Sequence, residues 1–149
     1  MSVIAKNKKA GFLYEFLEKF EAGIELKGTE VKSLRNHKVS INEAYAKFKK
    51  DEIFIVGMNI SPYEQGNREN HDPIRDRKLL MHRREIKRLA GKVQTKGFTI
   101  VPIAIYFNKR GIAKLELCLG RGKNKADKRE KVKKRMVERD IRREMLNKF

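Results

Sequence analysis

Residues 98–119, FTIVPIAIYFNKRGIAKLELCL, carry the clearest structural signal in the sequence. Two runs rich in β-branched, aromatic and aliphatic residues, 98–107 and 112–119, flank the segment NKRG at 108–111. Runs of this kind on either side of a short loop containing glycine predict a β-hairpin. Pro102 lies within the first run. Because proline donates no hydrogen bond to a sheet, we expect that strand to lie at an edge or to carry a bulge.

Similar patterns predict more strands upstream. The segment AYAKFKK (44–50) alternates apolar and polar residues, KKDE (49–52) turns the chain, and IFIVGMNI (53–60) runs back, which predicts a second hairpin. In GIELKG (23–28), Ile24 and Leu26 alternate with charged residues, which predicts a further strand. Five to seven short strands are therefore expected within about the first 115 residues.

Two helices are expected among these strands. Thr29 can cap EVKSLRN (30–36), with Glu30 favourably placed in the first turn. A second helix is predicted over 77–93, where Leu79, Leu80, Ile86, Leu89 and Val93 recur at roughly helical spacing. The intervening segment 61–77 is rich in Pro, Gly and Asn, so it is predicted to be a long loop.

Together these elements predict a mainly β protein, an OB-like closed β-barrel with flanking short helices. A length of 149 residues fits one domain of this kind, which we place at 1–120. Residues 121–149 are predicted to be a separate basic tail. They carry thirteen Lys or Arg against five acids, and a stripe of Val137, Ile141, Met145 and Phe149 four residues apart. We expect the tail to be disordered when free and helical where phosphates offset its charge.

The formal net charge of +18 exceeds what solubility requires and favours a polyanionic partner. The tail offers few bulky apolar residues for a membrane surface, so nucleic acid is the preferred partner. A single cysteine, Cys118, excludes an intramolecular disulfide, and its apolar neighbours predict a buried strand residue. Without a signal-like or spanning apolar segment, the sequence predicts a cytoplasmic protein.

Catalytic chemistry is poorly represented. The three histidines are scattered and none has metal-ligand spacing, so no metal or cofactor is expected. The segment NHDP (70–73) favours a turn in which Asn70 or Asp72 bonds to local backbone. A metal-dependent RNA-cleaving site using Glu64, Asp72 and Asp76 is disfavoured, because no second acidic cluster completes it. We therefore predict that the protein is not an enzyme.

Binding residues are easier to nominate. Lys32 and Arg35 are three apart on the first predicted helix and share a face. Asn7, Lys8 and Lys9 form a basic arm before the first predicted strand, and Lys92 and Lys96 belong to a cationic group on and after the second helix. Glu30 could accept hydrogen bonds from base edges, although a role at the helix dipole is the more economical interpretation. The four tyrosines could stack on bases, but their place among strand residues favours the core; they are Tyr14, Tyr45, Tyr63 and Tyr106.

Several motifs occur in order along nearly the whole chain. They include GTEVKSLR (28–35), SPYEQGN (61–67), HDPIRDRKLL (71–80), KGFTIVP (96–102) and RGKNKADKRE (121–130). This set resembles the SsrA-binding protein family, also called small protein B, the partner of transfer-messenger RNA (tmRNA) in bacterial ribosome rescue. The resemblance runs from Asn7 to about Arg135.

The resemblance implies an OB-like barrel that binds the tRNA-like domain of tmRNA. It also implies a tail that enters the decoding centre and empty mRNA channel of a stalled ribosome and folds there as a helix. A basic OB-fold ribosomal protein or general translation factor would explain the charge and the tail, but not the set of motifs.

Carried over residue by residue, the resemblance predicts an RNA-binding group and a decoding-site group. The RNA-binding group from the resemblance is Asn7, Lys8, Glu30, Lys32 and Arg35, and the charge of the second helix and the loop after it adds Lys92 and Lys96. The decoding-site group is Gly122, Lys123, Asp127, Lys128, Arg129, Lys131, Lys134, Arg135, Ile141 and Met145. Two departures occur in the tail signature: Asn124 replaces the usual second lysine, and Ala126 stands where the family commonly has His or Tyr.

Overall fold

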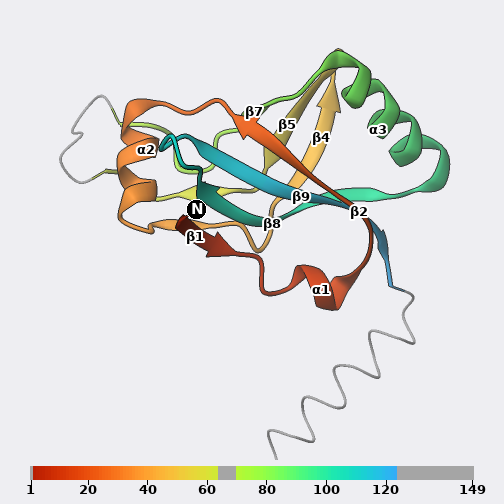
Figure 1. Ribbon diagram of the computed structural model, residues 1–149, viewed down its shortest axis with the longest axis horizontal. Coiled ribbons are helices and arrows are strands. Elements are labelled where there is room, and N and C mark those ends of the chain that lie inside the picture. The colour runs from red at the N-terminus through yellow and green to blue at the C-terminus, as the bar shows by residue number, and fades with distance from the viewer. Residues whose placement is uncertain (1, 64–69, 124–149) are drawn as a thin grey trace, which may run out of the picture.

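The computed structural model describes residues 2–63 and 70–123 (Figure 1). Its helices are α1 (Ala10–Leu13), α2 (Gly28–Arg35) and α3 (Arg83–Lys96). Its strands are β1 (Ser2–Lys6), β2 (Tyr14–Ile24), β3 (Val39–Ser40), β4 (Tyr45–Lys49), β5 (Glu52–Val56), β6 (Asn59–Ile60), β7 (Arg77–Leu80), β8 (Thr99–Phe107) and β9 (Ala113–Gly122). No helix in these two ranges is long and apolar enough to cross a membrane.

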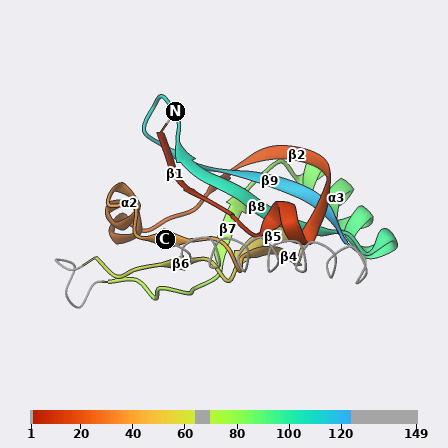
Figure 2. The ribbon, with the colours of Figure 1, turned by 90° about the horizontal axis from the view of Figure 1, so that it is seen from below.

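Seven strands form one antiparallel sheet in the order β1-β8-β9-β2-β7-β5-β4, and β3 pairs with β6. The predicted mainly β class with short helices is confirmed. The predicted closure of the barrel is wrong for the hydrogen-bonded sheet of the described residues, because no pairing joins β1 to β4; instead β4 packs beside β8. In both views α2 and α3 lie at opposite ends of the molecule (Figures 1 and 2).

The β8–β9 hairpin is confirmed, with pairing from Thr99 opposite Gly120 to Phe107 opposite Ala113. β8 lies between β1 and β9, but its pairing with β1 covers only Ala104–Phe107, so Pro102 is paired on the β9 side alone, opposite Leu117. The register shifts between Pro102 and Ala104, which is the bulge that the sequence offered as the alternative.

The β4–β5 hairpin is also confirmed, and its turn places Lys50 and Asp51 at φ values of 48° and 62°. The predicted strand 53–60 is divided in the structure. β5 ends at Val56, and Gly57 turns the chain with φ 78° before β6. A β-carbon at Gly57 would lie 2.8 Å from the carbonyl oxygen of Glu43, so the turn requires glycine.

The main core joins the inner faces of the strands to α2 and α3. Leu34 of α2, Ile55 of β5, Leu89 of α3 and Leu117 of β9 are fully buried in it. Cys118 is buried on β9, as predicted, in a second small cluster with Ala10 and Val101. α2 and α3 are therefore held by the same core.

Three sequence predictions were wrong in their boundaries. The strand predicted at 23–28 is instead the end of β2, which begins at Tyr14 and ends at Ile24. β1 precedes Asn7–Lys9, so these residues follow the first strand. α2 begins at Gly28, which places Thr29 inside the helix rather than at its cap.

The helix predicted over 77–93 begins later, at Arg83, and ends at Lys96. Residues 77–80 form β7 instead, with Leu79 buried and Leu80 exposed. Arg77 is also buried on the inward face. Because arginine is a polar residue, the sequence of this strand does not show the apolar–polar alternation that would predict it. In the predicted loop, the described residues 61–63 and 70–76 form neither strand nor helix, and 64–69 lie outside the described residues.

Candidate nucleic-acid interface

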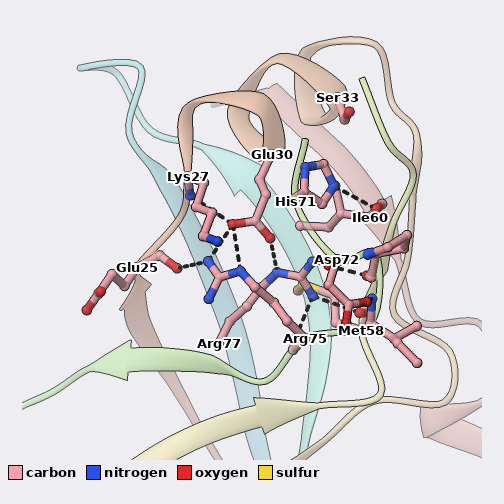
Figure 3. Close-up of polar contacts among 12 residues, drawn as sticks. Glu25, Lys27, Glu30, Ser33, Met58, Ile60, His71, Asp72, Arg75 and Arg77 are labelled. Atoms are coloured by element: carbon pink, nitrogen blue, oxygen red, sulfur yellow. Dashed lines mark hydrogen bonds and ion pairs between the residues drawn. The ribbon is translucent and has the colours of Figure 1, made fainter. Parts of the chain in front are cut away.

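α2 is built around a buried carboxylate. Glu30 is 0% exposed. Its Oε1 accepts the backbone N–H of Lys27 at 2.8 Å, which satisfies one free amide before the helix. The same oxygen accepts hydrogen bonds from Arg75, and Oε2 accepts one from Arg77 Nε (Figure 3). Glu30 therefore ties the start of α2 to the segment before β7.

The charge of Glu30 is favoured by these donors. Burial by itself raises the pKa of Glu30, but the hydrogen bonds from Arg75, the Lys27 N–H and Arg77 outweigh burial. The pKa of Glu30 therefore lies below its usual value, and the group is an anion at neutral pH. Neither carboxylate oxygen of Glu30 faces solvent, so in this arrangement Glu30 cannot accept hydrogen bonds from a base edge. Its contribution to an RNA-binding surface is to position α2 and Arg75.

Arg77 bonds both to Glu30 and to several backbone carbonyl groups around it. Its side chain is 0% exposed. Besides Glu30 it donates to the carbonyl oxygens of Met58 at 2.8 Å, and of Pro73 and Arg75 at 3.1 Å each. Segment 72–75 is thus wrapped around one guanidinium group (Figure 3). Because arginine carries five fixed donors, one side chain can set the path of a segment without regular structure.

His71 supplies a second attachment between α2 and this segment. It is 4% exposed. Its Nε2 lies 2.9 Å from the carbonyl oxygen of Ile60, which can only accept, so Nε2 carries the proton. Nδ1 lies 2.9 Å from the hydroxyl oxygen of Thr29, within hydrogen-bond distance. Ser33 Oγ donates to the carbonyl of Ser61 at 2.7 Å, so α2 is fixed to the β6 side along its length.

The outward face of α2 carries the predicted cations. Lys32 and Arg35 are both exposed. Lys32 Nζ lies 5.3 Å from the centroid of the Tyr63 ring, a cation–π distance. Arg75, whose side chain is 24% exposed, is bonded to Glu30 at the start of the same helix. The structure thus brings Lys32 and Arg35 together on a rigid frame, which is the arrangement expected of a phosphate-binding surface.

Asn7 and Lys8 lie elsewhere, between β1 and α1. Asn7 Nδ2 donates to the carbonyl of Pro102 at 2.9 Å, and Asn7 Oδ1 accepts the N–H groups of Lys9 and Ala10 at 3.1 Å each. Its amide is therefore occupied by backbone groups, distant in sequence on the nitrogen side and local on the oxygen side. The Lys8 side chain is exposed, whereas Lys9 is paired with Glu43.

Lys92 and Lys96 are on α3, at the far end of the molecule from α2 (Figure 1). Lys92 Nζ lies 3.2 Å from Glu18 Oε2, and Arg88 binds both oxygens of Glu18. The Arg88 hydrogen bonds in particular lower the pKa of Glu18 to about 2, against burial, with Lys92 assisting. Part of the α3 charge is thus neutralised within the protein, while Lys96 in the last turn is exposed.

The base of the tail is attached to α1. β9 ends at Gly122, and the Lys123 N–H donates to the carbonyl of Leu13 at 3.1 Å. Lys123 Nζ donates to the carbonyl of Gly11 at 2.9 Å. The tail helix, the two departures at 124 and 126, and the other decoding-site residues lie outside the described residues; these residues are Asp127, Lys128, Arg129, Lys131, Lys134, Arg135, Ile141 and Met145.

The acids of the alternative catalytic site do not converge in the described residues. Asp72 Oδ1 accepts the N–H of Ile74 at 3.0 Å, which confirms the predicted local turn. Asn70 bonds the backbone of Tyr63 instead. Within 2–63 and 70–123, no three His, Cys, Asp or Glu side chains are grouped as metal ligands. Glu64 lies outside these ranges.

Sequence reasoning missed the residues that hold this surface together, which are His71, Arg75 and Arg77. From the sequence, polar and charged side chains such as these are expected to face solvent, because composition does not distinguish a buried arginine from an exposed one. One signal could have indicated that Arg77 is buried. Alternate residues of a strand share a face, and Arg77 is two residues before the apolar Leu79.

Comparisons with known proteins find similarity to a single family over nearly the whole chain. A family model described as SmpB protein matches residues 4–147. An SsrA-binding protein of Pseudothermotoga lettingae is 54% identical over 142 residues, covering 95% of each chain. One of Geobacillus kaustophilus is 53% identical over 141 residues, covering 95% of this chain and 90% of its own. A solved structure presented as "tmRNA-SmpB: a journey to the center of the bacterial ribosome" contains a similar chain. That chain has a TM-score of 0.71 and 50% identity, with 89% of this chain and 95% of that one covered.

Proposed function

The chain belongs to the SmpB protein family, and on that premise we propose that it is a tmRNA-binding adaptor for ribosome rescue by trans-translation. The observation that carries the proposal is the similarity to the chain of the tmRNA–SmpB structure, which extends over most of both chains at 50% identity. An adaptor of this kind acts by binding and placement, so the protein is not an enzyme. Its partners are tmRNA and the ribosome, and its place of action is the cytoplasm.

Within this function, residues 1–120 bind the tRNA-like domain of tmRNA. Lys32 and Arg35 on α2 are the phosphate contacts that the geometry supports best, because both are exposed on a helix fixed by buried hydrogen bonds. Lys8 and Lys96 are exposed on other parts of the surface and serve a larger RNA footprint. Lys92 contributes less, because it already pairs with Glu18. Asn7 and Glu30 support the surface from within.

We assign the predicted tail, residues 121–149, to the decoding centre and the empty mRNA channel of a stalled ribosome, except that its first two residues, Arg121 and Gly122, belong to β9. The charge of the tail, thirteen cations against five acids, suits a path lined by RNA phosphates. The contact of Lys123 with the carbonyls of Gly11 and Leu13 fixes the point from which the tail leaves the body.

The alternative, a basic OB-fold ribosomal protein or general translation factor, predicts similar affinity for any structured RNA at a given salt concentration. The experiment compares the tRNA-like domain of tmRNA with an unrelated folded RNA of equal length, over rising salt. Counterion release weakens nonspecific binding steeply as salt rises. We expect the preference for the tRNA-like RNA to grow with salt; equal affinities throughout would favour the alternative.

A further inference from the structure

The outer face of the β7-β5-β4 edge of the sheet is a surface that the proposed function does not use. In β4, Ala46 and Phe48 pack on the main core, so Tyr45, Lys47 and Lys49 point outward. In β5, Ile53 and Ile55 are core residues, which places Glu52, Phe54 and Val56 on the same outer face. Lys78 and Leu80 of β7 complete it, opposite the buried Leu79.

Aromatic and cationic side chains are interleaved on this face. Phe54 pairs in register with Lys47 on one side and Lys78 on the other, so an aromatic ring stands between two lysines on neighbouring strands. Neighbouring strands lie about 4.8 Å apart. Tyr45 lies diagonally from Phe54, because its direct partner is Val56. At that diagonal spacing, about 7–8 Å, two rings can receive two neighbouring bases.

These aromatic residues have no role in the interior. Tyr45 is 43% exposed, contrary to the expectation that the tyrosines would lie in or at the core; Tyr106, at 7%, fits that expectation. Phe54 is half-buried and belongs to neither of the two core clusters. An exposed tyrosine beside a half-buried phenylalanine on the outer face of a sheet adds apolar surface outside the core, and grouped apolar surface of this kind is a feature of interaction sites.

The face continues into a groove of about 530 Å³. The groove lies between the β4–β5 turn, β7 and the start of α3, and Lys50, Lys78, Leu80, His82 and Arg83 are among its lining residues. Face and groove together present five cations, Lys47, Lys49, Lys50, Lys78 and Arg83, against two acids, Asp51 and Glu52. Lys78 pairs with Glu52 at 3.1 Å, whereas Lys47, Lys49 and Lys50 form no ion pair with any residue of 2–63 or 70–123.

We propose that this face, with its groove, binds a single-stranded RNA segment, with Tyr45 and Phe54 stacking on bases and Lys47, Lys49 and Lys50 contacting phosphates. Charge complementarity selects this occupant. Residues 124–149 carry eleven cations against five acids, so the chain's own tail and a second copy of the chain are both repelled. Base stacking beside a cationic path is the usual way in which proteins hold unpaired nucleotides.

The exposed face of α2 is a different surface: the groove at the end of the β7-β5-β4 face lies beside α3, and α3 is at the opposite end of the molecule from α2 (Figures 1 and 2). The inference therefore goes beyond the proposed function. It concerns a strand that is unpaired, whereas the α2 surface is proposed to bind a folded tRNA-like domain. A protein carrying both could hold two RNA segments at once.

The test uses the full chain and a fluorescent uridine oligomer of about twelve nucleotides, within the range of single-strand site sizes. Lys47→Glu is compared with Lys109→Glu, which makes the same charge change at an exposed residue of the β8–β9 turn. Tyr45→Ala is compared with Tyr45→Phe, which keeps the ring. We expect Lys47→Glu to weaken binding about tenfold more than Lys109→Glu, Tyr45→Ala to weaken it about tenfold, and Tyr45→Phe to bind like the unaltered chain.

The outcomes separate the alternatives. Equal effects of Lys47→Glu and Lys109→Glu, together with unchanged binding by Tyr45→Ala, would overturn the proposal. Loss of ribosome association by Tyr45→Ala without any loss of oligomer binding would also overturn it, in favour of a protein partner. Affinity for the tRNA-like RNA, measured in parallel, tests the proposed function by itself, and its failure would leave the oligomer result standing.

Discussion

Glu30 and Arg77 form an ion pair in which both side chains are 0% exposed, although one belongs to α2 and the other to β7. Forty-seven residues separate them in sequence. The pair joins the helix that carries Lys32 and Arg35 to the segment that carries Arg75. Because a buried ion pair has little stabilising value by itself, its consequence here is geometric: it fixes which way α2 faces.

Removing one partner of this pair should strongly destabilise the fold. Arg77→Met leaves the Glu30 carboxylate buried beside Arg75 alone and frees the carbonyls of Met58 and Pro73, so we expect unfolding to become easier by about 3–5 kcal/mol. Urea denaturation measures this. Glu43→Gln, which removes the exposed Lys9–Glu43 pair, is the control and should change stability by less than about 1 kcal/mol. Similar losses for both would contradict the role given to Arg77.

Glu30→Gln should weaken RNA binding through the position of α2. The neutral amide keeps the shape of the side chain but loses the charge that both arginines bind. We expect faster hydrogen exchange of the α2 amides together with lower affinity for the tRNA-like RNA. If affinity falls while α2 exchange is unchanged, Glu30 contacts RNA directly, and the buried arrangement is not the RNA-bound one.

The contacts of Glu18 with Arg88 and Lys92, which we call the Glu18 clamp, should make the free energy of unfolding depend on pH under acidic conditions. The folded-state pKa of Glu18 is about 2, below the value of about 4.3 for an unfolded glutamate. A lowered pKa contributes stability that is present above the unfolded value and is lost as pH falls toward the folded one. The stability difference between the unaltered chain and Glu18→Gln should thus be constant above about pH 5 and shrink between about 4 and 2. A difference independent of pH over that range would mean that the clamp is not formed in solution.

Deleting residues 127–149 should separate RNA binding from rescue. The deletion keeps Lys123 and its contacts with α1, and it leaves α2 untouched. We expect affinity for the isolated tRNA-like RNA to stay within about threefold, while rescue of stalled ribosomes is lost. A large and equal loss of RNA affinity would show that the tail is part of the RNA-binding surface, and the division between body and tail would fail.

The sequence predicted the hairpins because their signal is local. Alternation or apolar runs around a short turn identify β4–β5 and β8–β9, and a β-bulge was anticipated at Pro102. Most of β2 was not predicted, because Leu, Glu and Lys in YEFLEKFEAGI have no clear strand preference. Its pairing partner, β9, is also distant in sequence. Pairing over such distances leaves no short-range pattern.

The candidate site was predictable only in its exposed part. Lys32 and Arg35 follow from helical spacing, and both are exposed where predicted. The attachment of α2 could not be read from the sequence, because it depends on Arg77 facing inward and on His71 reaching Thr29 across forty-two residues. Lys92 is predicted from the sequence to bind RNA, and its pairing with Glu18 could not be foreseen because Glu18 is on a strand seventy-four residues away.

The central claim, that this chain is a tmRNA adaptor, is tested most directly by sequencing the RNA that co-purifies with the full chain under stringent salt. A chain carrying Lys32→Ala and Arg35→Ala together serves as the control, because both changes lie on the exposed face of α2. We predict that tmRNA is the most enriched RNA with the unaltered chain and that this enrichment is lost in the control. Equal recovery of ribosomal and other structured RNAs by both chains, without enrichment of tmRNA, would contradict the account.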